Sequence, residues 1–552
     1  MTGIEAFLDI LAKAGVSQLF GNPGTTELPL NDALARDPRF RYAFGLHEIP
    51  VVAMADGYAQ ASGHVGVANV HVTCGLGNAM GMLYNAHCAG TPLVLTAGQQ
   101  DRRLRLGEPV LVGDLVGVAR PWTKWAYEVE RVEDIPTAVR RAIQTALTPP
   151  TGPVFLSLPV DVQMQQATFP DLYPPYVADH RVRPPVEALK QAAERLARAK
   201  NPAILAGSRV TASGGIAELV ALAERLGATV FAEGTSSHGR LPMPVDHPLY
   251  AGILPLWSPD IHARLSPFDV LFAVGANVFR LYIHHEPECP LPATTALIHL
   301  DDDPWQIGKN VPVEVGLVGD PKAGLAELTE LLQRHPTSET IAERVWQRTM
   351  TRTREEQALR DIIAGERHHR PMTPLTFMES LARILPPDVA VVEEAITTHQ
   401  NVFERLGALR NPEGFFAHRG WALGWGMGAA MGVKIAWPDR PVLALIGDGA
   451  AMYGIQGLWT AAHHNLAVTF VIANNSQYKI LKVCGDVMNL PGLADPRCPG
   501  LDLTRPAIDF VGLARSLGVE AERVDDPETL SERVKASLGG NRPRLFEVPI
   551  AG

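Results

Sequence analysis

The chain has 552 residues, enough for three or four domains at about 150 residues each, which excludes a small disulfide-stabilised scaffold. Apolar residues make up 46% and charged residues 20% of the sequence, as in ordinary globular proteins, and this excludes wholesale disorder. The net charge of −10 is spread without a long single-sign block, so small molecules are better-suited partners than nucleic acid or an anionic membrane.

The cysteines and the apolar runs indicate the cellular compartment in which we expect the protein. Five scattered cysteines without a C-x-x-C pair fit neither a disulfide framework nor a zinc cluster, and they favour a reducing, cytoplasmic environment. The N-terminal residues lack the basic region and cleavage site of a secretion signal and predict an amphipathic helix that begins after Thr2. The most apolar run, residues 420–433, is shorter than the ~20 residues of a membrane span. We therefore expect a soluble protein.

The first unit has an alternating pattern of strands and helices. Apolar runs at 18–24, 65–73 and 92–99 alternate with helical patterns at 51–62 and 77–88, which predicts a parallel sheet. A last apolar run at 153–162 closes the unit, and a proline-rich segment follows that predicts a linker. We expect a first domain over residues 1–168.

Two further α/β units follow. A helical pattern at 186–200 and a strand pattern at 202–208 open a central domain, predicted over 186–336. A segment rich in Arg, Glu and His then predicts a solvated helix and connector. A third domain, predicted over 372–552, contains strand patterns at 389–394, 441–448 and 467–475. The predicted fold class is α/β, with three consecutive domains that each hold a mainly parallel sheet flanked by helices.

The strongest local signal is a pair of motifs in the third domain. One apolar strand ends in Gly447-Asp448-Gly449 and the next ends in Asn474-Asn475. Parallel strands finish at the same sheet edge, so Asp448 and Asn475 should meet there. With the backbone carbonyl of Gln477 they offer the hard oxygen ligands that suit Mg²⁺.

The glycines beside Asp448 indicate which kind of ligand binds at this edge of the sheet. They let the backbone amides of a helix start, at Gly447, Gly449 and Ala450, approach phosphate oxygens. Each motif alone is also typical of a turn or a helix cap. Together they predict a metal-bridged diphosphate and match the thiamine-diphosphate motif GDG…NN.

A thiamine enzyme also needs a carboxylic acid that hydrogen-bonds the aminopyrimidine of the cofactor and promotes loss of the C2 proton. Glu48, at a predicted strand end before an apolar helix, is the candidate, because desolvation raises the pKa of a carboxyl group. The alternative is a Glu in the first turn that interacts only with the helix dipole. In the glycine-rich run 418–436, Leu423 can act as a wedge beneath the cofactor, or as ordinary core.

The chain resembles, over essentially its whole length, the thiamine-diphosphate-dependent decarboxylases and lyases. The segments at 20–29, 47–63, 69–81, 92–100, 446–465 and 471–478 are most similar to benzoylformate decarboxylases. The resemblance implies that Glu48 activates the cofactor, that Leu423 is the wedge and that the Trp421 carbonyl accepts from the 4′-amino group. It further implies Mg²⁺ ligands and diphosphate contacts, namely Asp448, Asn475, the Gln477 carbonyl, Thr397 and Thr398.

On the substrate side the resemblance is weaker. It implies that Thr25 binds a substrate carboxylate and that His71 moves protons, although His71 can also be a buried structural histidine. Where the family has a second histidine this chain has Tyr282, and His284 or His285 can replace it. The acyl pocket is expected to be lined by Ile480, Leu481 and Cys484. These residues do not decide between an aryl and an aliphatic substrate.

The leading prediction is the non-oxidative decarboxylation of a 2-oxo acid to an aldehyde and CO₂, with thiamine diphosphate and Mg²⁺ as cofactors. The alternative is a carboligase or lyase that transfers the same activated acyl group to an acceptor. The resemblance also implies that the two cofactor-binding halves come from two subunits of a homodimer, which can pair into a homotetramer. A binding subunit without chemistry is disfavoured by the presence of Glu48, Asp448 and Asn475.

Overall fold

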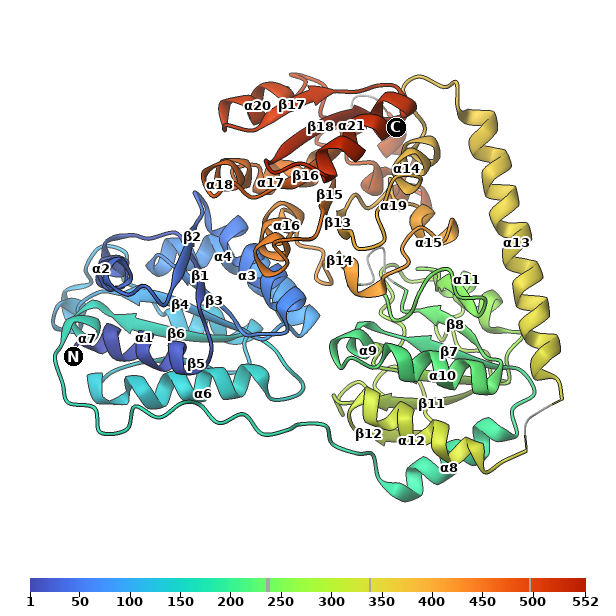
Figure 1. Ribbon diagram of the computed structural model, residues 1–552, viewed down its shortest axis with the longest axis horizontal. Coiled ribbons are helices and arrows are strands. Elements are labelled where there is room, and N and C mark those ends of the chain that lie inside the picture. The colour runs from blue at the N-terminus through green and yellow to red at the C-terminus, as the bar shows by residue number, and fades with distance from the viewer. Residues whose placement is uncertain (235–238, 337–338, 496–497) are drawn as a thin grey trace.

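The computed structural model describes residues 1–552 except 235–238, 337–338 and 496–497. It contains three six-stranded sheets, and the strand pairs within each run parallel. This arrangement confirms the predicted fold class. In Figure 1 the first domain, in blue to teal, lies at the lower left, the central domain, mostly in green, lies at the lower right, and the third domain, in orange and red, lies above them.

The first sheet has the strand order β2-β1-β3-β4-β6-β5. Its strands are β1 (Gln18–Gly21), β2 (Arg41–Phe44), β3 (Gly66–Val70), β4 (Leu93–Gln99), β5 (Ala126–Glu128) and β6 (Val154–Pro159). Its helices are α1 (Gly3–Lys13), α2 (Leu28–Arg36), α3 (Glu48–Ser62), α4 (Val72–Ala89), α5 (Leu115–Ala119), α6 (Ile135–Leu147) and α7 (Val160–Met164). Helix α1 begins as predicted, because Thr2 and Glu5 form a capping box at its first turn.

The central sheet has the order β12-β11-β10-β7-β8-β9. Its strands are β7 (Pro202–Ala206), β8 (Thr229–Ala232), β9 (Tyr250–Ile253), β10 (Val270–Val274), β11 (Ala296–Asp301) and β12 (Val315–Val318). Its helices are α8 (Val186–Ala197), α9 (Ser208–Ala212), α10 (Ile216–Leu226), α11 (Ser258–Leu265) and α12 (Pro321–Gln333). The long helix α13 (Ile341–Glu366) then runs along the outside of the molecule to the third domain (Figure 1).

The third sheet has the order β14-β13-β15-β16-β18-β17. Its strands are β13 (Ala390–Glu394), β14 (Phe415–Ala417), β15 (Val442–Gly447), β16 (Val468–Asn474), β17 (Glu520–Arg523) and β18 (Arg544–Pro549). Its helices are α14 (Pro374–Ala382), α15 (Val402–Arg405), α16 (Trp425–Ala436), α17 (Asp448–Gly454), α18 (Gly457–His463), α19 (Lys479–Val487), α20 (Phe510–Ser516) and α21 (Pro527–Leu538). The predicted domain boundaries at 168/186 and 336/372 stay predictions.

The first and third domains share a hydrophobic core through helices α3 and α16. The two helices approach so closely that a side chain on Gly432 would begin 2.0 Å from the carbonyl oxygen of Met54, and one on Gly57 would begin 2.4 Å from that of Ala429. Only glycine permits such an approach of two backbones. This contact brings the two predicted cofactor-binding halves together within one chain, whereas the family resemblance had implied that two subunits supply them.

The polypeptide has no helix, among the residues placed in the structure, with the length and apolar character needed to cross a membrane.

Candidate functional site

The metal-binding candidates meet at the carboxyl edge of the third sheet. Strands β15 and β16 are neighbours, with Gly447 opposite Ala473, so Asp448 and Asn475 follow adjacent strand ends as predicted. Asp448 is 4% exposed, and the backbone N–H groups of Ser476 and Gln477 beside it donate to the side-chain oxygens of Asn474 and Asn475. Burial outweighs the favourable effect of nearby backbone N–H groups and raises the pKa of Asp448 to about 6.

This edge fits a hard cation. The Oδ2 atom of Asp448 is buried without a hydrogen-bond partner, which is costly unless a ligand completes the site. Ser476, between Asn475 and Gln477, has a φ of +54°, an uncommon conformation that tends to occur at functional sites. The described residues include no cluster of three His, Cys, Asp or Glu side chains that could hold a metal, so a metal here must also use amide and backbone oxygens.

The predicted diphosphate contacts surround the same edge. The position of a Cβ on Gly447 lies 3.9 Å from Cα of Ala395, so the turn after β13 lies beside the start of α17. That turn carries Thr397, half-buried, and Thr398, buried. Ala450 lies one residue further along α17 than Gly449. The threonines and the first amides of α17 are therefore grouped at one place.

The cofactor loop, defined here as residues 418–424 between β14 and α16, carries both predicted pyrimidine contacts. Trp421 has a φ of +63°, which is strained for a bulky residue. Leu423 is half-buried and packs against the core shared by the first and third domains. A Cβ on Gly424 would lie 3.1 Å from Cγ2 of Ile49, so the start of α3, where Glu48 lies, adjoins the end of the cofactor loop next to Leu423.

Glu48 is the first residue of α3, four residues beyond the end of β2, rather than the strand end that the sequence predicts. The side chain is 7% exposed, and its Oε2 accepts a hydrogen bond from Nδ2 of Asn78 at 3.0 Å. A Cβ on Gly75 would lie 2.8 Å from Oε1 of Glu48 and 3.3 Å from Cβ of His71. Glu48 and His71 thus flank Gly75, and the structure brings the two predicted groups together.

His71 is paired with a carboxylate that is not among the predicted site residues. Strand β3 ends at Val70, and His71 forms the N-cap of α4. Its Nδ1 lies 2.7 Å from Oε2 of Glu27, which is 1% exposed. An ionised carboxylate can only accept hydrogen bonds, so Nδ1–H donates to Glu27 and the pair fixes the tautomer and orientation of the ring.

Glu27 is itself held in place by three donors. It accepts the backbone N–H of Gly24 at 2.9 Å, the hydroxyl of Thr26 at 2.9 Å and the backbone N–H of Gly98 at 2.7 Å. Thr25 lies in the same short turn and is exposed, so its hydroxyl is free to meet a substrate. The only sequence signal for Glu27 is its position two residues after Thr25 in the loop that resembles the family.

On the substrate side, it is Tyr282 that touches the cofactor loop. Its ring lies 4.9 Å from the ring of Trp421, centroid to centroid, and the side chain is 52% exposed. His284 faces solvent, with Nε2 3.9 Å from Glu286. His285 packs on Trp257 of the central domain at a ring distance of 5.6 Å.

The predicted acyl-pocket residues lie on helix α19, just after the Asn pair. Cys484 is buried, Ile480 is half-buried and Leu481 is exposed. Since Ile480 and Cys484 are one helical turn apart, they share the inward face of the helix. Burial raises the pKa of the Cys484 thiol, so it behaves as a small apolar side chain.

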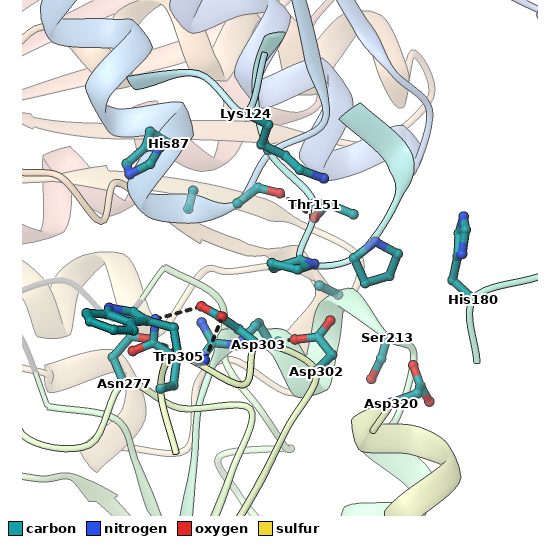
Figure 2. Close-up of a pocket in the computed structure, with 18 of the residues that line it drawn as sticks. His87, Lys124, Thr151, His180, Ser213, Asn277, Asp302, Asp303, Trp305 and Asp320 are labelled. Carbon is teal, nitrogen blue, oxygen red and sulfur yellow. Dashed lines mark hydrogen bonds and ion pairs between the residues drawn. The ribbon is translucent and has the colours of Figure 1, made fainter. Parts of the chain in front are cut away.

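A separate cavity of about 800 Å³ lies between the first and central domains. Figure 2 shows His87 and Lys124 on its first-domain side, and Asp302, Asp303 and Trp305 on its central-domain side. Burial and the neighbouring Asp301 raise the pKa of Asp302 to about 7. None of the predicted site residues lines this cavity, so it is distinct from the candidate cofactor site.

Comparison with known proteins agrees with this geometry. Residues 1–115, 189–328 and 395–548 match, in turn, the N-terminal TPP-binding, central and C-terminal TPP-binding domains of thiamine pyrophosphate enzymes. A benzoylformate decarboxylase of Pseudomonas aeruginosa is 36% identical over 99% of this chain and 98% of its own length. The chain belongs to the thiamine pyrophosphate enzyme family. The resemblance predicted from the sequence is confirmed.

Other relatives of this thiamine pyrophosphate enzyme indicate its chemistry. A 4-hydroxybenzoylformate decarboxylase of Rhodococcus jostii RHA1 superposes with a TM-score of 0.87 at 31% identity, over 100% of this chain and 99% of its own. A probable acetolactate synthase large subunit of Methanocaldococcus jannaschii is 30% identical over 100% of this chain and 92% of its own length. The comparisons support thiamine diphosphate as the cofactor, and they favour a carbon–carbon lyase of the decarboxylase type over the carboligase alternative.

Proposed function

We propose that this thiamine pyrophosphate enzyme decarboxylates a 2-oxo acid to an aldehyde and CO₂. The observation that carries the proposal is the position of Glu48, which lies beside the cofactor loop on one side and the His71–Glu27 pair on the other. A group that activates the cofactor and a group that moves substrate protons therefore adjoin the same space.

Thiamine diphosphate, when bound, supplies the electron sink that lets CO₂ leave. The protein supplies orientation and proton transfer. Glu48 would hold or release the proton that the aminopyrimidine of a bound cofactor needs, and Asn78 orients the carboxyl group by donating a hydrogen bond to it. The Trp421 carbonyl would accept a hydrogen bond from the amino group of the cofactor, and Leu423 would pack against it.

The metal and diphosphate would be held at the edge of the third sheet. Asp448, Asn475 and the carbonyl of Gln477 would bind Mg²⁺, and the orphaned Oδ2 of Asp448 supports this assignment. The amides at Gly447, Gly449 and Ala450, with the hydroxyls of Thr397 and Thr398, would hold the phosphate oxygens.

His71 would donate and accept protons at the reacting carbon and oxygen of the substrate through Nε2, since its Nδ1–H is engaged with Glu27. Thr25 would bind the substrate carboxylate. A secondary role for His284 or His285 stays a prediction, because the contact to the cofactor loop is made by Tyr282.

The acyl group of the substrate would lie against Ile480, Leu481 and Cys484, with Tyr282 closing the pocket from the central domain. The relatives named after benzoylformate and 4-hydroxybenzoylformate favour an aryl 2-oxo acid. The branched Ile480 and Leu481 favour an aliphatic one. The chemistry common to both is a 2-oxo acid with an apolar side chain.

We further propose a homodimer, which can pair into a homotetramer, in the cytoplasm. The segment after β4 supports a subunit contact, because Leu106 is 100% and Val110 82% exposed. Five cysteines without a disulfide support the reducing compartment. Light scattering of an active monomer would refute the assembly.

The proposed activity is tested by a panel of aryl and aliphatic 2-oxo acids, assayed for CO₂ and aldehyde with thiamine diphosphate and Mg²⁺. A second arm adds an acceptor aldehyde. Free aldehyde as the main product supports the decarboxylase, and acyloin formed in preference to free aldehyde supports the carboligase. Turnover of no 2-oxo acid by cofactor-loaded enzyme would refute both.

A further inference from the structure

The cofactor loop is sharply folded. It has two residues in the left-handed region, Trp421 with φ +63° and Gly424 with φ +98°. Such backbone persists only when the surrounding structure holds it. Three buried polar side chains contact the loop or its two ends, and they come from three different domains.

Glu394 holds the end of the loop from within the third domain. It lies at the end of β13, is 1% exposed, and accepts three backbone N–H groups at the start of α16. Oε1 accepts from Gly424 at 2.9 Å and Trp425 at 3.1 Å, and Oε2 accepts from Gly426 at 2.8 Å. Both carboxylate oxygens are therefore used to fix the backbone that follows Leu423.

Asn85 holds the middle of the loop from the first domain. It lies on α4 and is fully buried. Its Oδ1 accepts the N–H of Ala422 at 3.1 Å, and its Nδ2 donates to the carbonyl of Ala422 at 2.8 Å. This two-bond contact fixes the peptide between Trp421 and Leu423.

Glu233 holds the start of the loop from the central domain. It follows β8 and is 3% exposed, and its Oε1 accepts from Nη2 of Arg419 at 2.6 Å and from the N–H of Asn277 at 3.1 Å. Arg419 also donates to the hydroxyl of Ser208. Removal of either partner of a buried ion pair leaves an uncompensated buried charge, so the pair constrains how the central domain and the loop lie relative to each other.

We propose that Asn85, Glu233 and Glu394 are positioning residues that together set the geometry of the cofactor loop, and so of the Trp421 carbonyl and the Leu423 wedge. This inference rests on the proposed cofactor role of the loop. Its consequence is that each domain contributes to cofactor activation: the first and central domains act through the loop as well as through the substrate pocket.

The matched test uses Glu394→Gln. An amide keeps the size of the side chain, but its NH₂ group is a donor and must face one of the backbone N–H groups that now donate to Glu394. At least one of these hydrogen bonds to the end of the loop is therefore lost. The control is Glu379→Gln, which changes another buried carboxylate of the third domain. Glu379 lies on α14, pairs with Arg383 and does not touch the loop. Asn85→Ala tests the first-domain contact in the same way.

Two measurements are made. The first is backbone amide hydrogen exchange of residues 422–426 in the cofactor-free chain. The second is hydrogen–deuterium exchange at C2 of the bound cofactor with thiamine diphosphate and Mg²⁺ saturating. We expect faster amide exchange and about 10- to 100-fold slower C2 exchange in Glu394→Gln, because a displacement of ~1 Å is enough for such a loss. We expect both rates to be unchanged in Glu379→Gln.

Asn85→Ala should behave like Glu394→Gln with a smaller loss. The inference is overturned if Glu394→Gln keeps wild-type amide protection, or if it loses protection while C2 exchange stays at the wild-type rate. If the wild-type chain binds no thiamine diphosphate, the proposed function fails and the inference fails with it. Cofactor binding and C2 exchange in the wild type therefore show whether the proposed function has failed or only this inference.

Discussion

On the cofactor side of the site Asp448, Glu48 and Glu394 are between 1% and 7% exposed, whereas on the substrate side Tyr282 and Leu481 are 52% and 43% exposed. The cofactor side is therefore part of the cores that fold the chain, and its geometry is fixed before any ligand arrives. The substrate side combines the buried His71–Glu27 pair with an exposed part, which consists of a central-domain loop and helix α19. The exposed part of the substrate side is accessible to the substrate and to a second subunit.

This difference predicts unequal responses to mutation. Substitutions on the cofactor side should remove binding or activation of the cofactor. Substitutions on the substrate side should leave the cofactor bound. In the His71–Glu27 pair they should lower turnover, and in the exposed part they should change the apparent affinity for substrate or the choice among substrates.

The largest effect is expected for Asp448→Ala. The substitution removes the one carboxylate among the proposed Mg²⁺ ligands, so retention of thiamine diphosphate should fall at least ~100-fold, as measured by equilibrium binding with Mg²⁺. Chelation followed by gel filtration should remove activity from the wild type. Asp486→Ala, on the exposed face of α19, serves as the control. Full cofactor retention in Asp448→Ala would contradict the assignment.

The next effect concerns the His71–Glu27 pair. His71→Ala should lower kcat by ~10²–10³-fold while cofactor binding is kept, because the principal proton donor is lost. Glu27→Gln should lower kcat less, since the ring stays but its tautomer is no longer fixed. If Glu27→Gln acts only on thermal stability and leaves kcat unchanged, the carboxylate is structural.

A smaller effect is expected in the loop at Tyr282. Tyr282→Phe keeps the ring contact with Trp421 and should change kcat/KM little, whereas Tyr282→Ala should raise KM several-fold and alter the order of preferred 2-oxo acids. His284→Ala should be near neutral, because that side chain faces solvent. A strong loss of kcat in His284→Ala would mean that the loop closes on the site when substrate binds.

The parts of this account that could be predicted from the sequence are those with local signals. Asp448 and Asn475 each follow an apolar strand, and parallel strands must end at one edge, so the sequence alone predicts their meeting. The position of Glu48 before an apolar helix makes it a candidate from the sequence alone. The three α/β domains follow from the alternation of strand and helix patterns.

The contacts made by Glu27, Asn85 and Glu394 could not be predicted, because each joins segments far apart in the chain. Asn85 contacts a residue 337 positions away, and nothing near it in the sequence specifies Ala422. A lone amide on an otherwise apolar stretch of helix, as in Tyr84-Asn85-Ala86, is a weak signal of such a buried contact. The strain at Trp421 is likewise visible only in the backbone.

The central claim is that Glu48 activates a cofactor held by this chain, and C2 exchange of bound thiamine diphosphate tests it most directly. Wild type and Glu48→Gln are compared with cofactor and Mg²⁺ saturating, so that binding does not limit either rate. The account predicts that Glu48→Gln binds the cofactor and exchanges the C2 proton about 10²–10⁴-fold more slowly than the wild type. Equal rates in the two proteins would contradict it.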